Sequence, residues 1–273
     1  MSRMRHALTI AGSDSGGGAG VQADLKTFAA LGVYGTSAIT AVTAQNTRGV
    51  ITAAALSADL VTAQIEAIAG DIRVDAVKIG MLATAAIVEA VASAIEGLEL
   101  PLVVLDPVMM SSSGERLLDE DGVQALRLEL MPRSRVVTPN IPEAEVLSGC
   151  RIGSSADRRR AAERLHEMGA AAVVITGGHA GFADDGGDVV DLLFDGRSSI
   201  ELRAPRVRFD NTHRPHGTGC TFASALAASL ALGEPLEKSA ARAQQYVAGA
   251  IAHRIAVGQG ATVLDHFWQK RSG

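Results

Sequence analysis

Cysteine is scarce in this sequence: among 273 residues, only Cys150 and Cys220 carry a thiol. Two cysteines cannot form the disulfide framework of a small secreted protein, and they lack the partners of a zinc site, so we expect a reducing, cytoplasmic compartment. Long apolar runs are missing too, since no stretch reaches the roughly 18 to 20 residues that cross a bilayer. The early apolar run Ala7–Ala11 has the length of a strand and not that of a signal peptide. We therefore expect neither secretion nor a membrane partner.

Basic charge is sparse as well. Lysine occurs only at Lys26, Lys78, Lys238 and Lys270, and the formal net charge is −5. An acidic chain without a basic run lacks the electrostatic footprint of nucleic-acid binding, so we expect no nucleic-acid partner. Aromatic residues make up 3% of the chain, whereas apolar residues make up 47% and charged residues 20%. This balance is typical of a globular protein with a sizeable core and not of a disordered chain.

Strand-like apolar runs alternate with helix-like segments along nearly the whole chain. Such alternation predicts an α/β fold in which a mostly parallel sheet is covered by helices on both faces. No repeat or linker divides the pattern, so we predict a single domain over residues 1–273. The expected strands are His6–Ala11, Ala38–Thr43, Ala76–Ile79, Leu102–Leu105, Arg135–Thr138, Ala171–Thr176, Val189–Phe194 and Ile200–Ala204. The expected helices are Ala19–Leu31, Ala58–Ala69, Thr84–Ile95, Glu120–Met131, Ile141–Ser148, Ala156–Met168, Thr218–Leu232 and Leu236–Ala256.

The first expected strand runs into a glycine-rich stretch, residues 12–20, before the first helix. Its spacing fits neither the dinucleotide fingerprint G-x-G-x-x-G nor a Walker loop. Two interpretations stay open. Either the backbone comes close to a small ligand, with Asp24 facing the same cleft, or the stretch is a flexible turn and Asp24 is solvated.

Two further strand ends carry side chains that suit an aromatic ligand. Gln45 can both donate and accept hydrogen bonds, which fits a heterocycle that bears an amino group. Met81 follows a glycine and offers a soft apolar surface. The ordinary alternatives are a solvated loop glutamine and a core methionine. Both residues are candidates because ligands of open α/β sheets gather at the carboxyl ends of the strands.

Carboxylate and amide oxygens follow two other strands. Asp106 ends a buried strand just before a proline, and a carboxylate there is costly unless a cation, a donor or water faces it. Asp106 is therefore a candidate ligand of Mg²⁺ or of a metal-bound water. Asn140 and Glu143 follow the next strand three positions apart. This pair has an alternative role as a helix cap, in which Glu143 reaches back to Asn140.

An anion cradle is predicted at Gly217-Thr218-Gly219-Cys220. Two glycines let the backbone turn tightly and expose N–H groups at the positive end of the helix that follows. Cys220 would lie where the helix dipole favours a thiolate and lowers the thiol pKa; the alternative is a small buried side chain. Earlier in the chain, Thr176-Gly177-Gly178 ends a strand and would give a nucleotide close access to the backbone.

Six strings of this sequence occur in the order found in one known family. They are Ala11–Asp24, Ala44–Thr47, Lys78–Met81, Asp106–Met109, Thr138–Asn140 and Gly217–Cys220. Together they resemble the hydroxymethylpyrimidine/phosphomethylpyrimidine kinases of thiamine biosynthesis, over nearly the whole chain. The resemblance implies the ribokinase-like fold, a three-layer α/β/α sandwich with a mostly parallel central sheet. It also implies transfer of the γ-phosphoryl group of ATP to 4-amino-5-hydroxymethyl-2-methylpyrimidine, and a second transfer onto the resulting monophosphate.

The resemblance also implies roles for individual residues. Cys220 would take the hydroxyl proton, while the backbone N–H groups of Gly217, Thr218 and Gly219 would stabilise charge on the transferred group. The pyrimidine would be held by residues matching Gly12, Ala19, Val21, Gln45, Met81 and Val108, to which the cleft interpretation adds Asp24. ATP and magnesium would lie toward Asp106, Asn140, Glu143, Thr176, Gly178 and Gly219, with Asp106 and Glu143 next to the metal.

The sequence departs from the family pattern in two places. Arg214-Pro215-His216 lengthens the approach to the cradle, and Thr176 stands where the family commonly has lysine. Arg214 is a candidate for the missing charge. The nearest alternative activity is that of a pyridoxal kinase of the same fold, and a catalytically silent pyrimidine-binding protein is another. Family members are often dimers, and the apolar region Val33–Ala44 is the expected contact.

Overall fold

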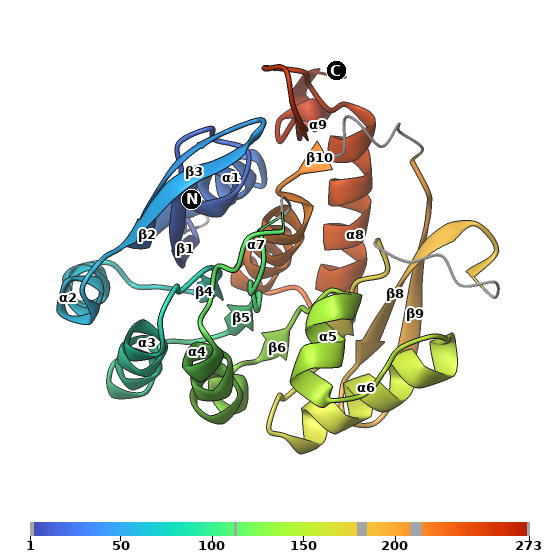
Figure 1. The fold of residues 1–273 in the computed structure, drawn as a ribbon, viewed down its shortest axis with the longest axis horizontal. Coiled ribbons are helices and arrows are strands. Elements are labelled where there is room, and N and C mark those ends of the chain that lie inside the picture. The colour runs from blue at the N-terminus through green and yellow to red at the C-terminus, as the bar shows by residue number, and fades with distance from the viewer. Residues whose placement is uncertain (1–2, 112–113, 179–184, 208–214, 272–273) are drawn as a thin grey trace.

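A nine-stranded sheet runs through the middle of the molecule in the order β3-β2-β1-β4-β5-β6-β7-β8-β9 (Figure 1). The structure is a computed structural model that describes residues 3–111, 114–178, 185–207 and 215–271. Six neighbouring strands are parallel: β2, β1, β4, β5, β6 and β7. β3 runs antiparallel to β2, and β8 runs antiparallel to both β7 and β9. The strands are β1 (His6–Asp14), β2 (Tyr34–Asn46), β3 (Gly49–Ala55), β4 (Ala76–Ile79), β5 (Val103–Leu105), β6 (Val136–Val137), β7 (Val173–Ile175), β8 (Asp188–Phe194) and β9 (Ser199–Pro205).

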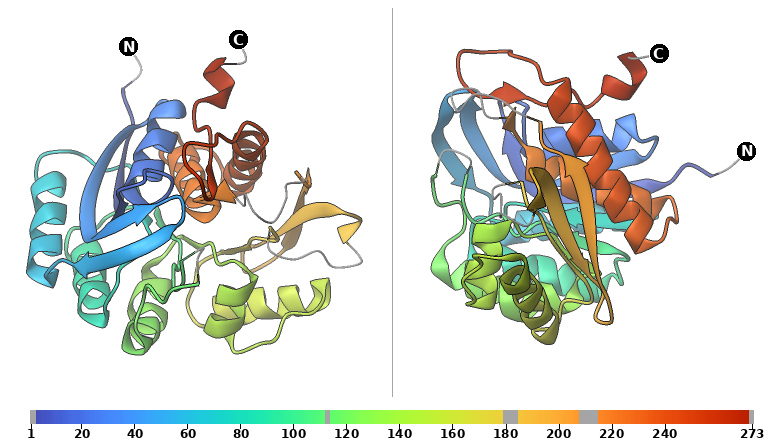
Figure 2. Two further views of the ribbon diagram at one scale, coloured as in Figure 1. Left: turned by 45° about the horizontal axis from the view of Figure 1, so that its top comes forward. Right: turned by 90° about the vertical axis from the view of Figure 1, so that its right-hand side faces the viewer.

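Helices cover both faces of this sheet, which confirms the predicted α/β class and its three layers (Figures 1 and 2). One layer holds α1 (Gly20–Ala30), α7 (Thr218–Ala231) and α8 (Leu236–Ala252). The other holds α2 (Ala58–Ala69), α3 (Ala85–Gly97), α4 (Glu120–Ala125), α5 (Ile141–Ser148) and α6 (Ser155–Glu167). Outside these layers lie α9 (Trp268–Arg271) and the small strands β10 (Pro215–His216) and β11 (Thr262–Val263). Within the described ranges, no helix is long and apolar enough to cross a membrane.

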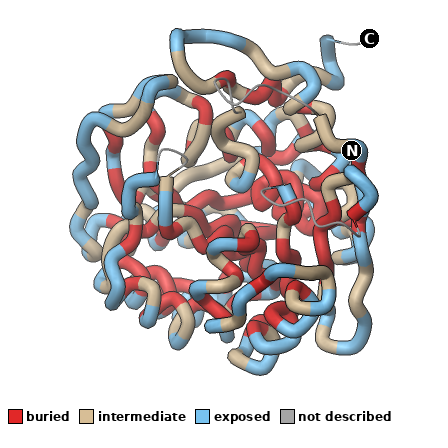
Figure 3. The backbone as a smooth tube through the Cα atoms, turned by 45° about the vertical axis from the view of Figure 1, so that its right-hand side comes forward, coloured by how far each residue is buried: buried red, intermediate tan, exposed pale blue. Residues whose placement is uncertain are grey.

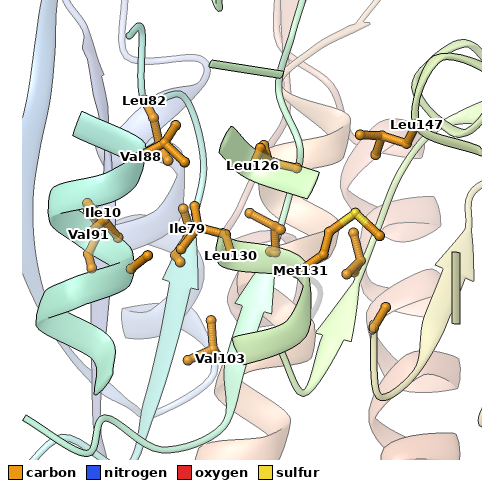
Figure 4. Packing of buried hydrophobic residues seen from close by; sticks show 14 of the residues in the cluster. Ile10, Ile79, Leu82, Val88, Val91, Val103, Leu126, Leu130, Met131 and Leu147 are labelled. Atoms are coloured by element: carbon orange, nitrogen blue, oxygen red, sulfur yellow. The ribbon is translucent and has the colours of Figure 1, made fainter. Parts of the chain in front are cut away.

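The central strands β5, β6 and β7 are wholly apolar because each supplies side chains to both helix layers. Val103 and Leu105 of β5 pack toward α3 and α4, whereas Val104 between them packs toward α7, as the two-residue period of a strand requires. Figure 4 shows the first of these cores, in which Val88 and Val91 of α3 lie close to the strands. Buried residues accordingly fill the centre of the molecule in Figure 3, with exposed residues at the outer turns.

The sequence missed one strand of the large sheet. β3 pairs antiparallel with β2, and most of its residues are exposed. Its sequence, GVITAAA, therefore lacks the alternation of apolar and polar residues that marks a half-buried strand. The helix expected over Glu120–Met131 is α-helical only to Ala125 and then continues as a π-helical turn over Leu126–Leu130. The last long helix ends at Ala252, four residues before the expected end.

The order of strands creates a switch point beside β1. The chain passes from β1 to β2 on one side, and it reaches β4 on the other side of β1 only after β3 and α2. Ligands of open α/β sheets bind at such a point, beyond the carboxyl ends of the strands. The glycine-rich stretch, which begins in the last residues of β1, and Met81 after β4 both lie there.

Candidate active site

The predicted anion cradle packs directly against the glycine-rich stretch. Gly217 caps α7 with a φ of +84°, a conformation that glycine adopts without a steric penalty. A Cβ on Gly217 would collide with the carbonyl oxygen of Gly18. The Thr221 hydroxyl donates to the Gly217 carbonyl at 2.8 Å, which secures the first turn of the helix. The cradle and residues 12–20 therefore form one continuous surface.

The glycine-rich stretch is organised by a buried carboxylate. Asp14 Oδ1 accepts the N–H of Gly16 at 2.8 Å, and Oδ2 accepts those of Gly18 at 3.0 Å and Ala19 at 2.9 Å. Burial opposes the charge, but these donors and His216 outweigh it and lower the Asp14 pKa. The stretch is thus an ordered loop and not the flexible turn that the sequence left open. Sequence reasoning gave Asp14 no role.

The expected pyrimidine contacts meet at the switch point. A Cβ on Gly12 would lie 3.0 Å from Met81 Sδ. A cavity of about 330 Å³ also borders Met81, but its other lining residues, among them Ala41 and Leu118, include none of the expected pyrimidine contacts. Gln45 is half-buried at the end of β2, and its Nε2 lies 2.9 Å from His216 Nε2. Among the remaining expected contacts, Ala19 and Val108 are half-buried, whereas Val21 of α1 is buried.

Asp106 is buried at the end of β5 and points toward the cradle. A Cβ on Gly219 would lie 3.8 Å from each of its carboxylate oxygens. Burial and the nearby Asp24 raise the pKa of Asp106 to about 6, against the pull of Lys78. Its Oδ2 has no hydrogen-bond partner among the described residues. The Lys78 ammonium lies 4.0 Å from this oxygen, beyond hydrogen-bond distance. A buried carboxylate oxygen without a hydrogen bond fits a hard cation such as magnesium.

The position of Glu143 is compatible with both roles considered from the sequence, as part of a helix cap and as a neighbour of the metal. It forms the capping box of α5: its Oε2 accepts the N–H of Asn140 at 2.9 Å, and its own N–H donates to Asn140 Oδ1 at 3.0 Å. Burial, together with the charge of Asp106, raises the Glu143 pKa to about 8. Two carboxylates that oppose each other's ionisation favour a cation between them. Over the described residues no group of three His, Cys, Asp or Glu side chains could hold a metal, but magnesium uses one or two carboxylates with substrate phosphates.

The expected nucleotide contacts lie along the next strand ends. Asn140 and Thr176 form an isolated parallel bridge, in which the Thr176 N–H donates to the Pro139 carbonyl at 2.9 Å. Gly178 is exposed, and the neighbouring Gly177 N–H donates to the buried Asp191 at 2.8 Å. The backbone near Gly178 is therefore held in place and open to solvent. Arg214, the candidate for the missing lysine charge, lies outside the described residues.

The electrostatics of Cys220 differ from the expectation. Its place in the first turn of α7 predicted a lowered pKa, yet burial raises the thiol pKa to about 12. Lys78 opposes this rise, whereas Asp106 and Asp24 add to it. Removal from water and two buried carboxylates thus outweigh the helix dipole. The thiol carries its proton at neutral pH.

Asp24 does not face the cleft, which corrects its assignment as a substrate contact. Its carboxylate is fully buried and accepts hydrogen bonds from Thr9 Oγ1 at 2.6 Å, Ser224 Oγ at 2.6 Å and Lys78 Nζ at 3.0 Å. Lys78 is fully buried too, with Nζ 4.0 Å from Asp106 Oδ2. Burial lowers the Lys78 pKa, but the neighbouring anions outweigh it and hold the pKa above its usual value.

Comparisons with known proteins agree with this geometry. The model of the phosphomethylpyrimidine kinase family matches residues 14–265. A hydroxymethylpyrimidine/phosphomethylpyrimidine kinase of Bacillus subtilis (strain 168) is 47% identical over 266 residues, 97% of this chain and 96% of that protein. This chain belongs to the phosphomethylpyrimidine kinase family.

Solved structures support the same family. The ADP complex of Bacillus subtilis pyridoxal kinase has a TM-score of 0.88 at 37% identity, covering 98% of this chain and 100% of that one. Phosphomethylpyrimidine kinase from Clostridium difficile 630 has a TM-score of 0.79 at 38% identity, covering 91% and 100%. The ribokinase-like fold expected from the sequence is thereby confirmed.

Three residues of this phosphomethylpyrimidine kinase site were missed as contributors. Lys78 is the only charged residue of β4, and a charge inside an apolar strand was the available signal. Asp14 stands among glycines, where a short acceptor commonly organises a turn. His216 was noticed only as part of the lengthened approach to the cradle. Its contacts with Asp14 and Gln45 depend on residues about two hundred positions away.

Proposed function

We infer that this chain is the hydroxymethylpyrimidine and phosphomethylpyrimidine kinase of thiamine biosynthesis. One observation carries the inference: Gln45 and Met81, the expected pyrimidine contacts, border the same ordered loop as the cradle at Gly217. An acceptor hydroxyl and a phosphate chain can therefore meet over residues 12–20. We propose ATP as the donor, a single domain as the working unit, and the cytoplasm as its compartment.

The chain's own groups suit a phosphoryl transfer. The backbone N–H groups at the start of α7 are placed to bind an anion and would require no reorganisation during the reaction. Asp106 and Glu143 would hold magnesium, which neutralises charge on the phosphate oxygens when it is bound. The acceptor oxygen bonds to the γ-phosphorus as the bond from that phosphorus to the β-bridging oxygen breaks.

Cys220 is the proposed acceptor of the hydroxyl proton. With a pKa of about 12, the thiol must first lose its own proton before it can serve as a base. Lys78 is the neighbouring charge that favours this loss. In the loose transition state of phosphoryl transfer the hydroxyl proton leaves late, so a small thiolate fraction suffices.

The deciding experiment measures ADP release from magnesium-ATP with hydroxymethylpyrimidine, its monophosphate or pyridoxal as the acceptor. We expect turnover of both pyrimidines, and a loss of 100-fold or more in kcat for Cys220→Ala, the range of a missing acid–base group. Cys150→Ser is the matched control and should retain full activity, because Cys150 lies beside α5 and away from the cradle. Turnover of neither pyrimidine would contradict the proposal.

Pyridoxal phosphorylation is the second candidate activity. The observation that favours it is the TM-score of 0.88 to a pyridoxal kinase, compared with 0.79 to a phosphomethylpyrimidine kinase at nearly equal identity. A kcat/KM for pyridoxal above that for hydroxymethylpyrimidine would retain the chemistry and change the substrate.

We also propose that the protein forms a homodimer through the β2–β3 hairpin. Val33 is buried and cannot contribute, contrary to the expected region. On the two paired strands of the hairpin, Val42 and Ile51 have 48% and 76% of their surface exposed. Apolar side chains gathered on one exposed hairpin are typical of a contact surface.

A further inference from the structure

The polar side chains around His216 point to an unassigned role for this residue. His216 Nε2 lies 3.3 Å from Asp14 Oδ2 and 2.9 Å from the Gln45 amide nitrogen. The ring is held firmly: β10, which contains His216, pairs with β11, and a Cβ on Gly18 would lie only 2.9 Å from His216 Cδ2. A fixed imidazole thus joins a buried carboxylate to the amide that is expected to contact the substrate.

The charge of Asp14 decides which atom of His216 carries a proton. An ionised carboxylate only accepts hydrogen bonds, and three backbone N–H groups donate to Asp14 and stabilise its negative charge. His216 Nε2 must therefore bear a hydrogen directed at Asp14 Oδ2, because a bare lone pair would face the anion. A protonated Nε2 cannot also accept a hydrogen bond from the Gln45 amide nitrogen.

The contacts of Thr43 independently indicate that the oxygen and nitrogen of the Gln45 amide should be exchanged. Its hydroxyl has one proton, yet Oγ1 lies within donor distance of both the Ser13 carbonyl, at 3.0 Å, and Gln45 Oε1, at 3.2 Å. Exchanging the oxygen and nitrogen of the Gln45 amide removes both conflicts. The single Nε2–H group of His216 is then shared between two acceptors, Gln45 Oε1 and Asp14 Oδ2. The Gln45 NH₂ group donates to Thr43 Oγ1, which itself donates to the Ser13 carbonyl.

We propose that His216 is a positioning residue that, with Asp14 and Thr43, fixes the Gln45 amide in the orientation that selects an aminopyrimidine over pyridoxal. This inference rests on the proposed function. The fixed amide retains one free lone pair on Oε1 and one free N–H. A ring nitrogen beside an exocyclic amino group presents the complementary acceptor and donor, whereas pyridoxal has no amino group next to its ring nitrogen.

Two substitutions separate this role from a merely structural one. His216→Phe keeps a flat ring but removes the donor, so the amide is free to turn. We expect KM for hydroxymethylpyrimidine to rise about tenfold or more, as for the loss of one buried hydrogen bond, with little change in kcat and in KM for pyridoxal. His216→Gln restores a donor near the position of Nε2 and should recover most of the affinity.

Equal losses for both acceptors, or a loss in kcat alone, would overturn the proposal. A measurement on the unaltered protein covers the case in which His216→Phe does not fold. In ¹⁵N-histidine NMR spectra, His216 should have a protonated Nε2, with the signal identified by its absence from His216→Gln. A bare Nε2 would refute the assignment. Failure of the proposed function is distinguishable, because the wild-type protein would then not turn over either pyrimidine.

Discussion

Lys78 shows how a single buried side chain supports this site. Its ammonium group lies between the carboxylates of Asp24 and Asp106, at 3.0 Å and 4.0 Å, and has no exposed surface. Asp24 connects it further to Thr9 on β1 and Ser224 on α7. One cation therefore links the central strands to the helix that carries the cradle.

Removal of this cation alone should be very costly. Lys78→Met leaves the Asp24 carboxylate buried without its partner charge, and we expect the free energy of unfolding to fall by about 3–5 kcal/mol. Lys78→Met combined with Asp24→Asn removes both charges and should cost clearly less. Urea denaturation of the two variants makes the comparison. A double variant that is no more stable than the single one would contradict this account of the pair.

At the scale of elements, buried parts of the fold were predictable and exposed parts were not. The strands expected at Val189–Phe194 and Ile200–Ala204 are present as the paired strands β8 and β9. The β2–β3 hairpin was missed because β3 is largely exposed, and its place depends on pairing with β2.

The candidate site was predictable to a similar extent. Motif strings identified Asp106, Gln45 and Gly217, because each stands at a strand or helix end. The strings did not reveal that Asp24 pairs with Lys78, 54 positions away. The raised pKa of Cys220 was missed for the same reason, since it comes from burial and from neighbours that only the folded chain supplies.

The contact between α8 and the C-terminal segment offers a test at this scale. Gly249 lies in α8, where a Cβ would collide with the indole of Trp268, which stacks on His253 at 5.4 Å between ring centroids. In Gly249→Ala we expect the indole to be displaced, although alanine is the better helix former by about 1 kcal/mol. Trp268 is the sole tryptophan, so its fluorescence should shift to the red. Gly97→Ala, with open space at its Cβ, is the control and should leave the spectrum unchanged.

At the scale of the whole molecule, the proposed dimer makes a prediction about mass. Ile51→Lys places a charge on the most exposed apolar side chain of the β2–β3 hairpin. If two hairpins pack together, the buried lysine has no partner, and light scattering should show a dimer for the wild type and a monomer for the variant. Leu128→Lys is the matched control, because Leu128 is 62% exposed but lies on the turn after α4. A wild-type monomer would refute the proposal.

The short pair of β10 and β11 has a consequence for how the protein is made. His216 and the approach to the cradle gain their strand partner only when residues 262–263 are in place. A ribosome synthesises the chain from its N-terminus, so the sheet and most helices can form while this partner is still missing. A nascent chain that stops short of these residues therefore lacks the β10–β11 pair that holds His216 beside the cradle.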